Sequence, residues 1–239
     1  MSEVGEFLRR DRTWHPAALS NGYKSTTYRA PRRPPLALPP SIGELSGPVF
    51  GDSALGPLDN DLIRNYATTG DAIGERIVVH GTVMDENGRA VPGALIEIWQ
   101  ANAGGKYRHV DDKYMAPLDP NFGGGGRVVS DAQGRYSFRT IRPGPYPFPN
   151  DGCAWRPAHI HLSIFGQAFL QRLVTQFYFE GDPLISRCVI VNTISNPAAI
   201  ASLIAKLDME SMQAFDCLAY RFDIVLRGRN ETYFENKGS

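Results

Sequence analysis

The sequence predicts an all-β fold: an antiparallel β-sandwich with an extended N-terminal arm and one or two short helices. Three observations lead to this prediction. β-branched runs of strand length recur after residue 75, turns rich in Gly, Pro and Asx separate them, and prolines crowd the segment before them. Short strands punctuated in this way are typical of sandwiches and barrels. We therefore expect one domain over residues 1–239, divided into an arm (1–70) and a sandwich core (71–239).

The arm is defined by its prolines and aromatic residues. Proline fixes φ and lacks a backbone donor, so the segment 31–35 cannot run through the middle of a sheet. Disordered segments are usually poor in aromatic residues. This one contains four, which favours an arm laid across a partner: Trp14, Tyr23, Tyr28 and Phe50. A short helix is expected near residues 59–66.

Six strands are expected in the core, at residues 76–84, 94–99, 136–141, 158–164, 173–179 and 220–226. Two predicted turns separate the first three of them. Residues 85–88 end in Asn-Gly, which suits positive φ, and residues 130–134 end in another glycine. The glycine run 123–126 lacks the Lys-Ser/Thr of a P-loop, so we expect a loop there and no nucleotide site.

One longer helix is expected near residues 195–207. Ser195 or Asn196 can cap it, and Pro197 suits its first turn. Its apolar residues recur at helical spacing and would form one stripe: Ile200, Leu203, Ile204 and Leu207. We expect this stripe to pack on the sandwich; a groove for a partner is the alternative.

The charge balance argues against a nucleic-acid or membrane partner. Lys plus Arg (25) equals Asp plus Glu (25), and both partners usually require a basic excess. No apolar run approaches the roughly 18 residues needed to span a bilayer, and the N-terminus lacks the apolar core of a signal peptide. The cysteines Cys153, Cys188 and Cys217 are odd in number and far apart. We therefore expect reduced thiols, a cytoplasmic location and a small-molecule substrate.

The strongest local signal is a pair of histidines on one predicted strand. Side chains alternate along a strand, so His159 and His161 share one face while Ala158, Ile160 and Leu162 point to the other. Residues two apart on a strand lie roughly 6.5–7 Å apart, which allows both imidazoles to bind one metal ion. The alternative is a polar strand face that happens to hold two histidines.

Two histidines do not complete a metal site. No H-E-x-x-H motif or cysteine cluster accompanies them, which argues against zinc. Two tyrosines lie nearby in sequence: Tyr146 between prolines, and Tyr107 in a loop opened by glycines. A phenol titrates near pH 10, so a hard ferric ion is the metal best able to hold it as phenolate. Taken alone, each tyrosine is better explained as a core or interface residue, so these residues alone leave a two-Tyr, two-His iron site open.

Eight segments together resemble the intradiol ring-cleavage dioxygenases. The most specific are Arg-Pro-Gly-Pro-Tyr-Pro at 142–147 and Trp-Arg-Pro-Ala-His-Ile-His at 155–161. The other six lie at residues 11–16, 74–76, 99–103, 118–124, 176–182 and 220–228. The arm and the C-terminal segments resemble the branch of the family whose β chains pair with a homologous α chain.

This resemblance implies the roles of particular residues. The ligands of one Fe(III) per β chain would be Tyr107, Tyr146, His159 and His161, with hydroxide as the fifth ligand. Tyr146 would leave the metal when substrate binds, and Arg156 would stabilise charge that builds on the ring. The substrate pocket would include Tyr23, Gln176, Trp99 and Ile190. At position 148 the family leads us to expect tryptophan, and the phenylalanine found there keeps an aromatic wall but loses an N–H donor.

The resemblance also implies a reaction and a partner. The chain would cleave protocatechuate with O2 to 3-carboxy-cis,cis-muconate, in the β-ketoadipate route of aromatic degradation, within a hetero-oligomer of αβ units. Alternatives are a catechol or hydroxyquinol 1,2-dioxygenase, an α-like scaffold subunit without iron, or a transthyretin-like binding module. A helical N-terminal dimerisation segment would favour the first alternative, and the proline-rich arm argues against it.

Overall fold

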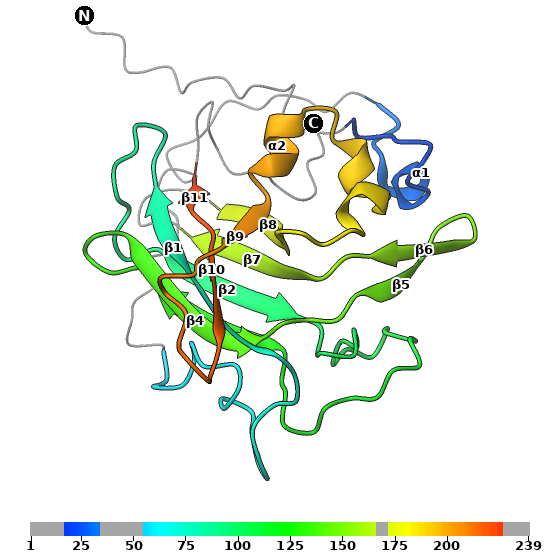
Figure 1. Ribbon diagram of the computed structural model, residues 1–239. Coiled ribbons are helices and arrows are strands. Elements are labelled where there is room, and N and C mark those ends of the chain that lie inside the picture. The colour runs from blue at the N-terminus through cyan, green and yellow to red at the C-terminus, as the bar shows by residue number, and fades with distance from the viewer. Residues whose placement is uncertain (1–16, 34–54, 166–171, 227–239) are drawn as a thin grey trace, which may run out of the picture.

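The computed structural model describes residues 17–33, 55–165 and 172–226 (Figure 1). The predictions for Trp14 and Phe50 lie outside these residues. In chain order the elements are α1 (Ser25–Arg29), β1 (Arg76–Met84), β2 (Leu95–Gln100), β3 (Gly125–Val129), β4 (Arg135–Ile141), β5 (Tyr146–Pro149), β6 (Cys153–Arg156), β7 (His159–Phe165), β8 (Arg172–Phe179), η4 (Ile185–Arg187), η5 (Val191–Thr193), α2 (Pro197–Ala201), β9 (Ile204–Leu207), β10 (Leu218–Arg221) and β11 (Ile224–Val225).

The predicted all-β fold is confirmed. Among the described residues, nine strands form one sheet in the order β11-β1-β10-β9-β8-β7-β2-β3, with β4 paired to β1. Most pairings are antiparallel, as predicted, but β1–β10, β1–β11 and β8–β9 are parallel. A parallel pair needs a long crossover. For β8 and β9 this crossover contains η4, η5 and α2, which lie together above the sheet in Figure 1.

Apolar residues that alternate along the strands of this sheet point to one side and form the hydrophobic core. On β7, Ile160, Leu162 and Ile164 are fully buried, and the same holds for Phe177 and Phe179 on β8. Burying each such side chain contributes about 1.5–3 kcal/mol. Because the side-chain period of a strand is 2, burying this set turns His159 and His161 to the opposite face of β7.

Two predicted helices differ from the structure. Residues 59–66 form turns, because Asp61 pairs with Arg139 and the Leu62 N–H donates to the Arg139 carbonyl at 2.9 Å. The helix predicted at 195–207 begins as expected: Asn196 caps Ala198 N at 2.9 Å and Pro197 occupies the first turn. It ends at Ala201, however, because the following residues enter the sheet as β9, between β8 and β10. Strand pairing overrides the helical period there.

Two smaller predictions also need correction. The strand predicted at 220–226 is divided into β10 and β11, and both pairings to β1 are parallel. The second half of the glycine run, predicted as a loop, belongs to β3, where Gly125 and Gly126 pair with Trp99 and Ile98 of β2. At Gly126 an added Cβ would lie 2.4 Å from Leu62 Cδ1, so close packing accounts for this glycine.

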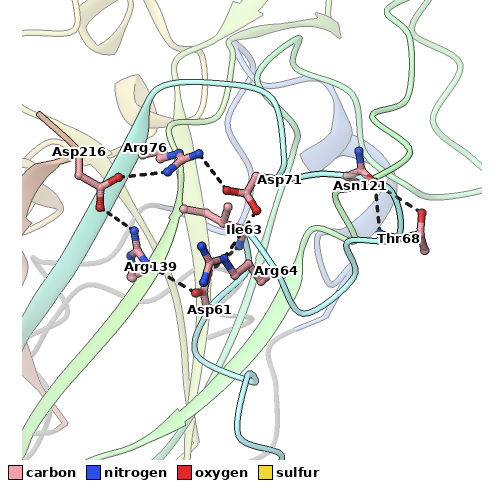
Figure 2. Close-up of polar contacts among 9 residues, drawn as sticks. All are labelled: Asp61, Ile63, Arg64, Thr68, Asp71, Arg76, Asn121, Arg139 and Asp216. Carbon is pink, nitrogen blue, oxygen red and sulfur yellow. Dashed lines mark hydrogen bonds and ion pairs between the residues drawn. The ribbon is translucent and has the colours of Figure 1, made fainter.

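An ionic network holds the segment before β1 against the sheet (Figure 2). Arg76 forms ion pairs with Asp71 at 2.9 Å and with Asp216 at 3.1 Å. Arg139 on β4 joins the same Asp216 at 2.7 Å and Asp61 at 3.7 Å. Single exposed pairs contribute little, but these side chains are about one-third exposed and share partners. The network therefore joins β1, β4 and the loop before β10.

The first described part of the arm, residues 17–33, packs on the hairpin formed by β5 and β6. Lys24 N donates to Asn150 Oδ1 at 2.9 Å, and Asn150 Nδ2 donates to the Gly22 carbonyl at 3.1 Å. The Lys24 ammonium pairs with Asp151 at 2.9 Å. In Figure 1 the hairpin projects from the sheet on the same side as α1. Residues far apart in sequence thus meet at the hairpin turn.

Two further expectations concern the cysteines and the membrane. Cys188 and Cys217 are buried free thiols, as expected for packing residues. None of the helices in the described ranges is long and apolar enough to cross a membrane.

Candidate metal centre and substrate pocket

Strand register brings four of the predicted site residues together on one face of the sheet. His161 of β7 lies directly opposite Trp99 of β2 on one side and Gln176 of β8 on the other. His159 lies opposite Tyr178. Directly opposed residues in antiparallel strands point to the same face. The row Trp99, His161 and Gln176 therefore follows from pairing alone, and the Trp99 and His161 rings stack at 5.0 Å.

The hairpin supplies Tyr146 and Arg156. Tyr146 is the first residue of β5 and pairs with Arg156, the last residue of β6. Pro157 and Ala158 then separate Arg156 from His159 at the start of β7. Because proline cannot donate to a ladder, it suits the bend between the hairpin and the sheet.

Tyr107 lies in a loop held by buried polar contacts. The buried Asn102 accepts hydrogen bonds from the backbone of Gly104 and Lys106, at 2.9 and 3.0 Å. Tyr107 N donates to Asp112 Oδ2 at 2.8 Å, and the Lys106 ammonium pairs with the other oxygen of this carboxylate at 3.3 Å. Burial alone would raise the pKa of Asp112, but these bonds, with one from Tyr114 N, lower it overall. Asp112 is thus an ionised acceptor for the Tyr107 backbone.

The two tyrosine-bearing segments cross in direct backbone contact. Gly144 N donates to the Asn102 carbonyl at 3.0 Å. A Cβ on Gly144 would lie 2.3 Å from the Ala103 oxygen, and a Cβ on Gly105 would lie 2.3 Å from the Pro145 oxygen. Each glycine precedes its tyrosine by two residues. Only glycine allows the backbones to approach this closely, so these two positions fix how Tyr107 meets Tyr146.

The four predicted ligands converge on one another. Tyr107 Oη and Tyr146 Oη lie 3.5 and 3.4 Å from His159 Nε2. The two imidazole rings are 4.9 Å apart and the two phenol rings 5.5 Å apart, both edge to face. The rings of Tyr107 and His161 are 6.3 Å apart. Residues separated by more than fifty positions in the chain therefore surround one small volume.

His159 is held in the form that binds metals. Its Nδ1 lies 2.7 Å from the Pro157 carbonyl, which can only accept, so Nδ1 carries the proton and Nε2 presents a lone pair. The pKa of His159 is well below its ordinary value, first because of burial and then because of the positive charge of Arg156 and the neighbouring His161. The imidazole is therefore neutral near pH 7.

This donor set fits a trivalent iron ion. Two ligand atoms each about 2.1 Å from one ion, at 90–120° to each other, lie roughly 3.0–3.6 Å apart. The phenol-to-imidazole separations of 3.4 and 3.5 Å fall in this range. No group of three or more His, Cys, Asp or Glu suited to a metal occurs in the described part of the chain. A metal at this centre would therefore depend on the two phenols, which favour a ferric ion.

Arg156 is the first member of a buried chain of hydrogen-bonded side chains. Only 4% of its surface is exposed, and one terminal nitrogen donates to Gln176 Oε1 at 2.6 Å. Gln176, also 4% exposed, donates through Nε2 to Tyr178 Oη at 2.6 Å. The pair Arg156 and Gln176 was predicted from sequence, but Tyr178 was not. Its position two residues after Gln176 on a strand was the signal that could have identified it.

A cavity of about 650 Å³ opens beside the phenols, lined among others by Tyr107, Tyr146, Tyr114 and Phe148. This volume suits a small aromatic ligand. Of the other predicted pocket residues, Tyr23 is buried and its ring lies 5.8 Å from that of Phe148. Ile190 packs on a hydrophobic cluster that contains Tyr178.

Family models match most of the chain. The model described as "Dioxygenase" matches residues 45–228, and "Protocatechuate 3,4-dioxygenase beta subunit N terminal" matches residues 8–41. Together they span both the arm and the sheet.

Individual relatives agree with these models. The chain is 48% identical to the protocatechuate 3,4-dioxygenase β chain of Burkholderia cepacia, over 95% of this chain and 96% of that one. It is 32% identical to the α chain of the Pseudomonas putida enzyme, over 82% of this chain and 96% of that one. The structure of 3-chlorocatechol 1,2-dioxygenase from Rhodococcus opacus 1CP superposes with a TM-score of 0.55 at 27% identity, covering 75% of this chain and 69% of that one. The chain therefore belongs to the intradiol ring-cleavage dioxygenase family, and its N-terminal segment marks the protocatechuate 3,4-dioxygenase β-chain branch.

Proposed function

We propose that this chain is the iron-bearing β subunit of a protocatechuate 3,4-dioxygenase, which cleaves protocatechuate with O2 to 3-carboxy-cis,cis-muconate. The observation that carries this proposal is the convergence of two phenols and two imidazoles on one small volume beside a cavity of about 650 Å³. The likeness to a β chain over nearly its full length supports the choice of substrate.

The metal would be held by Tyr107, Tyr146, His159 and His161, one Fe(III) per chain. When bound, ferric iron supplies a Lewis acid that orients a vicinal diol and withdraws charge from its ring. The neutral, Nδ1-protonated form of His159 supports this assignment, because metal ligands must present a lone pair.

The protein's own groups would manage protons and charge. Tyr146 Oη, at the cavity wall, would accept a proton from a substrate hydroxyl, as a positioned general base does. Arg156 would present fixed positive charge where the ring oxygen gains ketone character. Such a preorganised donor contributes about 3–4 kcal/mol to a transition state. Stacking of Trp99 on His161 and packing of Tyr23 on Phe148 would keep the site rigid.

The chain would act with a homologous α chain in αβ units, in the cytoplasm. The α-chain relative is similar to this chain over most of its length, which supports a pseudo-symmetric pair. The arm would wrap the partner, as extended segments do when they cover a large neighbouring surface.

The decisive experiment is co-expression with a protocatechuate dioxygenase α chain, followed by iron analysis, visible spectroscopy and O2 uptake. We expect red-brown protein from tyrosinate-to-iron charge transfer, one iron per β chain, and faster O2 uptake with protocatechuate than with catechol. The product should have the mass and spectrum of 3-carboxy-cis,cis-muconate. Colourless protein that remains inert after iron is supplied would contradict the proposal, and a preference for catechol would correct the substrate.

A further inference from the structure

We propose that Tyr178 is a positioning residue: its hydroxyl oxygen anchors the Gln176 amide by accepting a hydrogen bond from it, and that amide holds the Arg156 guanidinium in place for ring cleavage. This inference rests on the proposed function. It concerns a residue that is neither one of the four predicted ligands nor among the residues that line the cavity. Three buried side chains carry it, joined by two hydrogen bonds of 2.6 Å.

The direction of this chain follows from donor chemistry. Arginine has only donors, so the atom of Gln176 that faces Arg156 must be the oxygen. The amide nitrogen must then face Tyr178, and the phenol oxygen must accept from it. A glutamine amide has nearly the same shape in both orientations. The donors of Arg156 therefore select the amide orientation, and the Tyr178 oxygen is the acceptor that holds the amide nitrogen in it.

Burial makes the two hydrogen bonds of Gln176 difficult to replace. Arg156 and Gln176 are each 4% exposed and Tyr178 is fully buried, so water does not replace a lost partner freely. Without the phenol oxygen, the amide N–H groups of Gln176 would lose a buried acceptor. An amide that turned over would direct its N–H groups at the guanidinium. Either outcome releases Arg156 from its fixed position.

The surroundings keep Tyr178 itself in place. Its ring packs in a cluster with Cys188, Val191, Ile194, Ala199 and Leu203, formed by the crossover between β8 and β9. The same ring lies 6.0 Å from that of His159, its cross-strand neighbour. Phenylalanine at this position would keep these ring contacts, so a Tyr178→Phe change removes the hydroxyl alone.

The test uses the co-expressed αβ enzyme with the Tyr178→Phe substitution. We expect kcat for protocatechuate to fall about 10- to 100-fold, the size typical when a group that orients an active-site residue is removed, with KM changed little. Iron content and the tyrosinate absorption band should match the wild type, since no ligand is altered. A crystal structure of the variant should show Gln176 and Arg156 separated beyond hydrogen-bond distance.

A double substitution decides whether the three residues act as one unit. Gln176→Leu removes the middle of the chain, so adding Tyr178→Phe to it should lower kcat no further. The matched control is Tyr136→Phe: this tyrosine is also buried with a hydrogen-bonded hydroxyl, which donates to the Phe222 carbonyl, but it lies on β4 away from the site. It should lower the melting temperature and leave kcat unchanged.

Two results would overturn the inference. One is wild-type kcat in Tyr178→Phe; the other is a double variant whose loss is the product of the two single losses, because Tyr178 would then act independently of Gln176. Failure of the proposed function would look different, because the wild-type complex itself would neither take up O2 with protocatechuate nor show the iron-tyrosinate band.

Discussion

Arg156 brings a full positive charge into a site where only 4% of its surface is exposed. A buried charge is costly unless paired or hydrogen-bonded, and here the Gln176 oxygen accepts from it at 2.6 Å. The same charge helps to lower the pKa of His159, after burial. One side chain thus helps to keep an imidazole neutral, and under the proposed function it would direct positive charge toward the substrate.

We therefore expect Arg156→Ser to reduce kcat for protocatechuate by about 10²–10³, as for loss of one preorganised donor, while iron remains bound. O2 uptake and iron analysis of the αβ complex check this expectation. Arg135→Ser is the matched control, since that arginine is exposed and pairs with Asp131 on a distant turn. Unchanged turnover in Arg156→Ser would rule out its role.

At the scale of elements, the site is the meeting point of a sheet, a hairpin and a loop. The sheet contributes both histidines, the hairpin Tyr146 and Arg156, and the loop Tyr107. The loop and the hairpin touch through glycine backbones, so their relative position depends on having no side chain at the crossing.

Gly144→Ala should disturb this crossing. The new Cβ would lie 2.3 Å from the Ala103 oxygen and 2.7 Å from Gly105 N, both backbone atoms. We expect a loss of about 1–3 kcal/mol of stability from overpacking, with a weaker tyrosinate absorption band because the phenols separate. Gly125→Ala serves as control, since its Cβ would meet only the Ile98 oxygen at 3.8 Å. If both variants behave alike in thermal melts and spectra, the crossing does not set the phenol positions.

Asp112→Asn tests the loop from its other end. Asp112 accepts from Tyr107 N at 2.8 Å and Tyr114 N at 2.8 Å, and an amide nitrogen in place of either oxygen would face a donor. We expect iron affinity to fall about 10- to 100-fold, measured by competition with a chelator. The neighbouring Asp111→Asn should have no effect, because the Asp111 side chain is 84% exposed. Equal affinities in the two variants would contradict a role for Asp112 in holding Tyr107.

Across the whole molecule, ionised carboxylates join distant parts of the chain and make stability depend on pH. Glu180, after β8, binds Lys206 at 3.0 Å and Leu207 N at 3.1 Å on β9. The hydrogen bond from Lys206, and then that from Leu207, lowers the pKa of Glu180 against the opposing effect of burial. A carboxyl with a depressed folded-state pKa stabilises the fold above its unfolded pKa, near 4.3, and loses this effect as pH falls through the folded value.

Glu180→Gln should therefore be less stable than wild type at pH 6–8, and the difference should shrink toward zero near pH 3. Urea unfolding at a series of pH values measures it. Glu210→Gln, at an exposed site beyond β9, should show no such pH-dependent difference. A Glu180→Gln deficit that persists at pH 3 would mean that packing, and not the carboxylate charge, causes it.

Much of the site was predictable from the sequence because it depends on local periods. Alternation along one strand put His159 and His161 on one face, and prolines around Tyr146 indicated a stiff, directed ring. The all-β class and the turns at 85–88 and 130–134 followed from β-branched runs and from turn segments that contain Asx and end in glycine, and Gly88 and Gly134 do adopt positive φ. The ferric ligand set, by contrast, came from the family resemblance, since each tyrosine alone had an ordinary structural alternative.

What only the tertiary structure decided is which distant residues become neighbours. The residues 204–207 read as helix by their period, yet they form a strand because β8 and β10 supply backbone partners on both sides. Register placed Gln176 and Trp99 on either side of His161, and it brought Tyr178 into the hydrogen-bond chain of Arg156. The periodicity of a helix or strand depends on residues close together in the sequence, whereas pairing between strands depends on the free energy of the whole sheet.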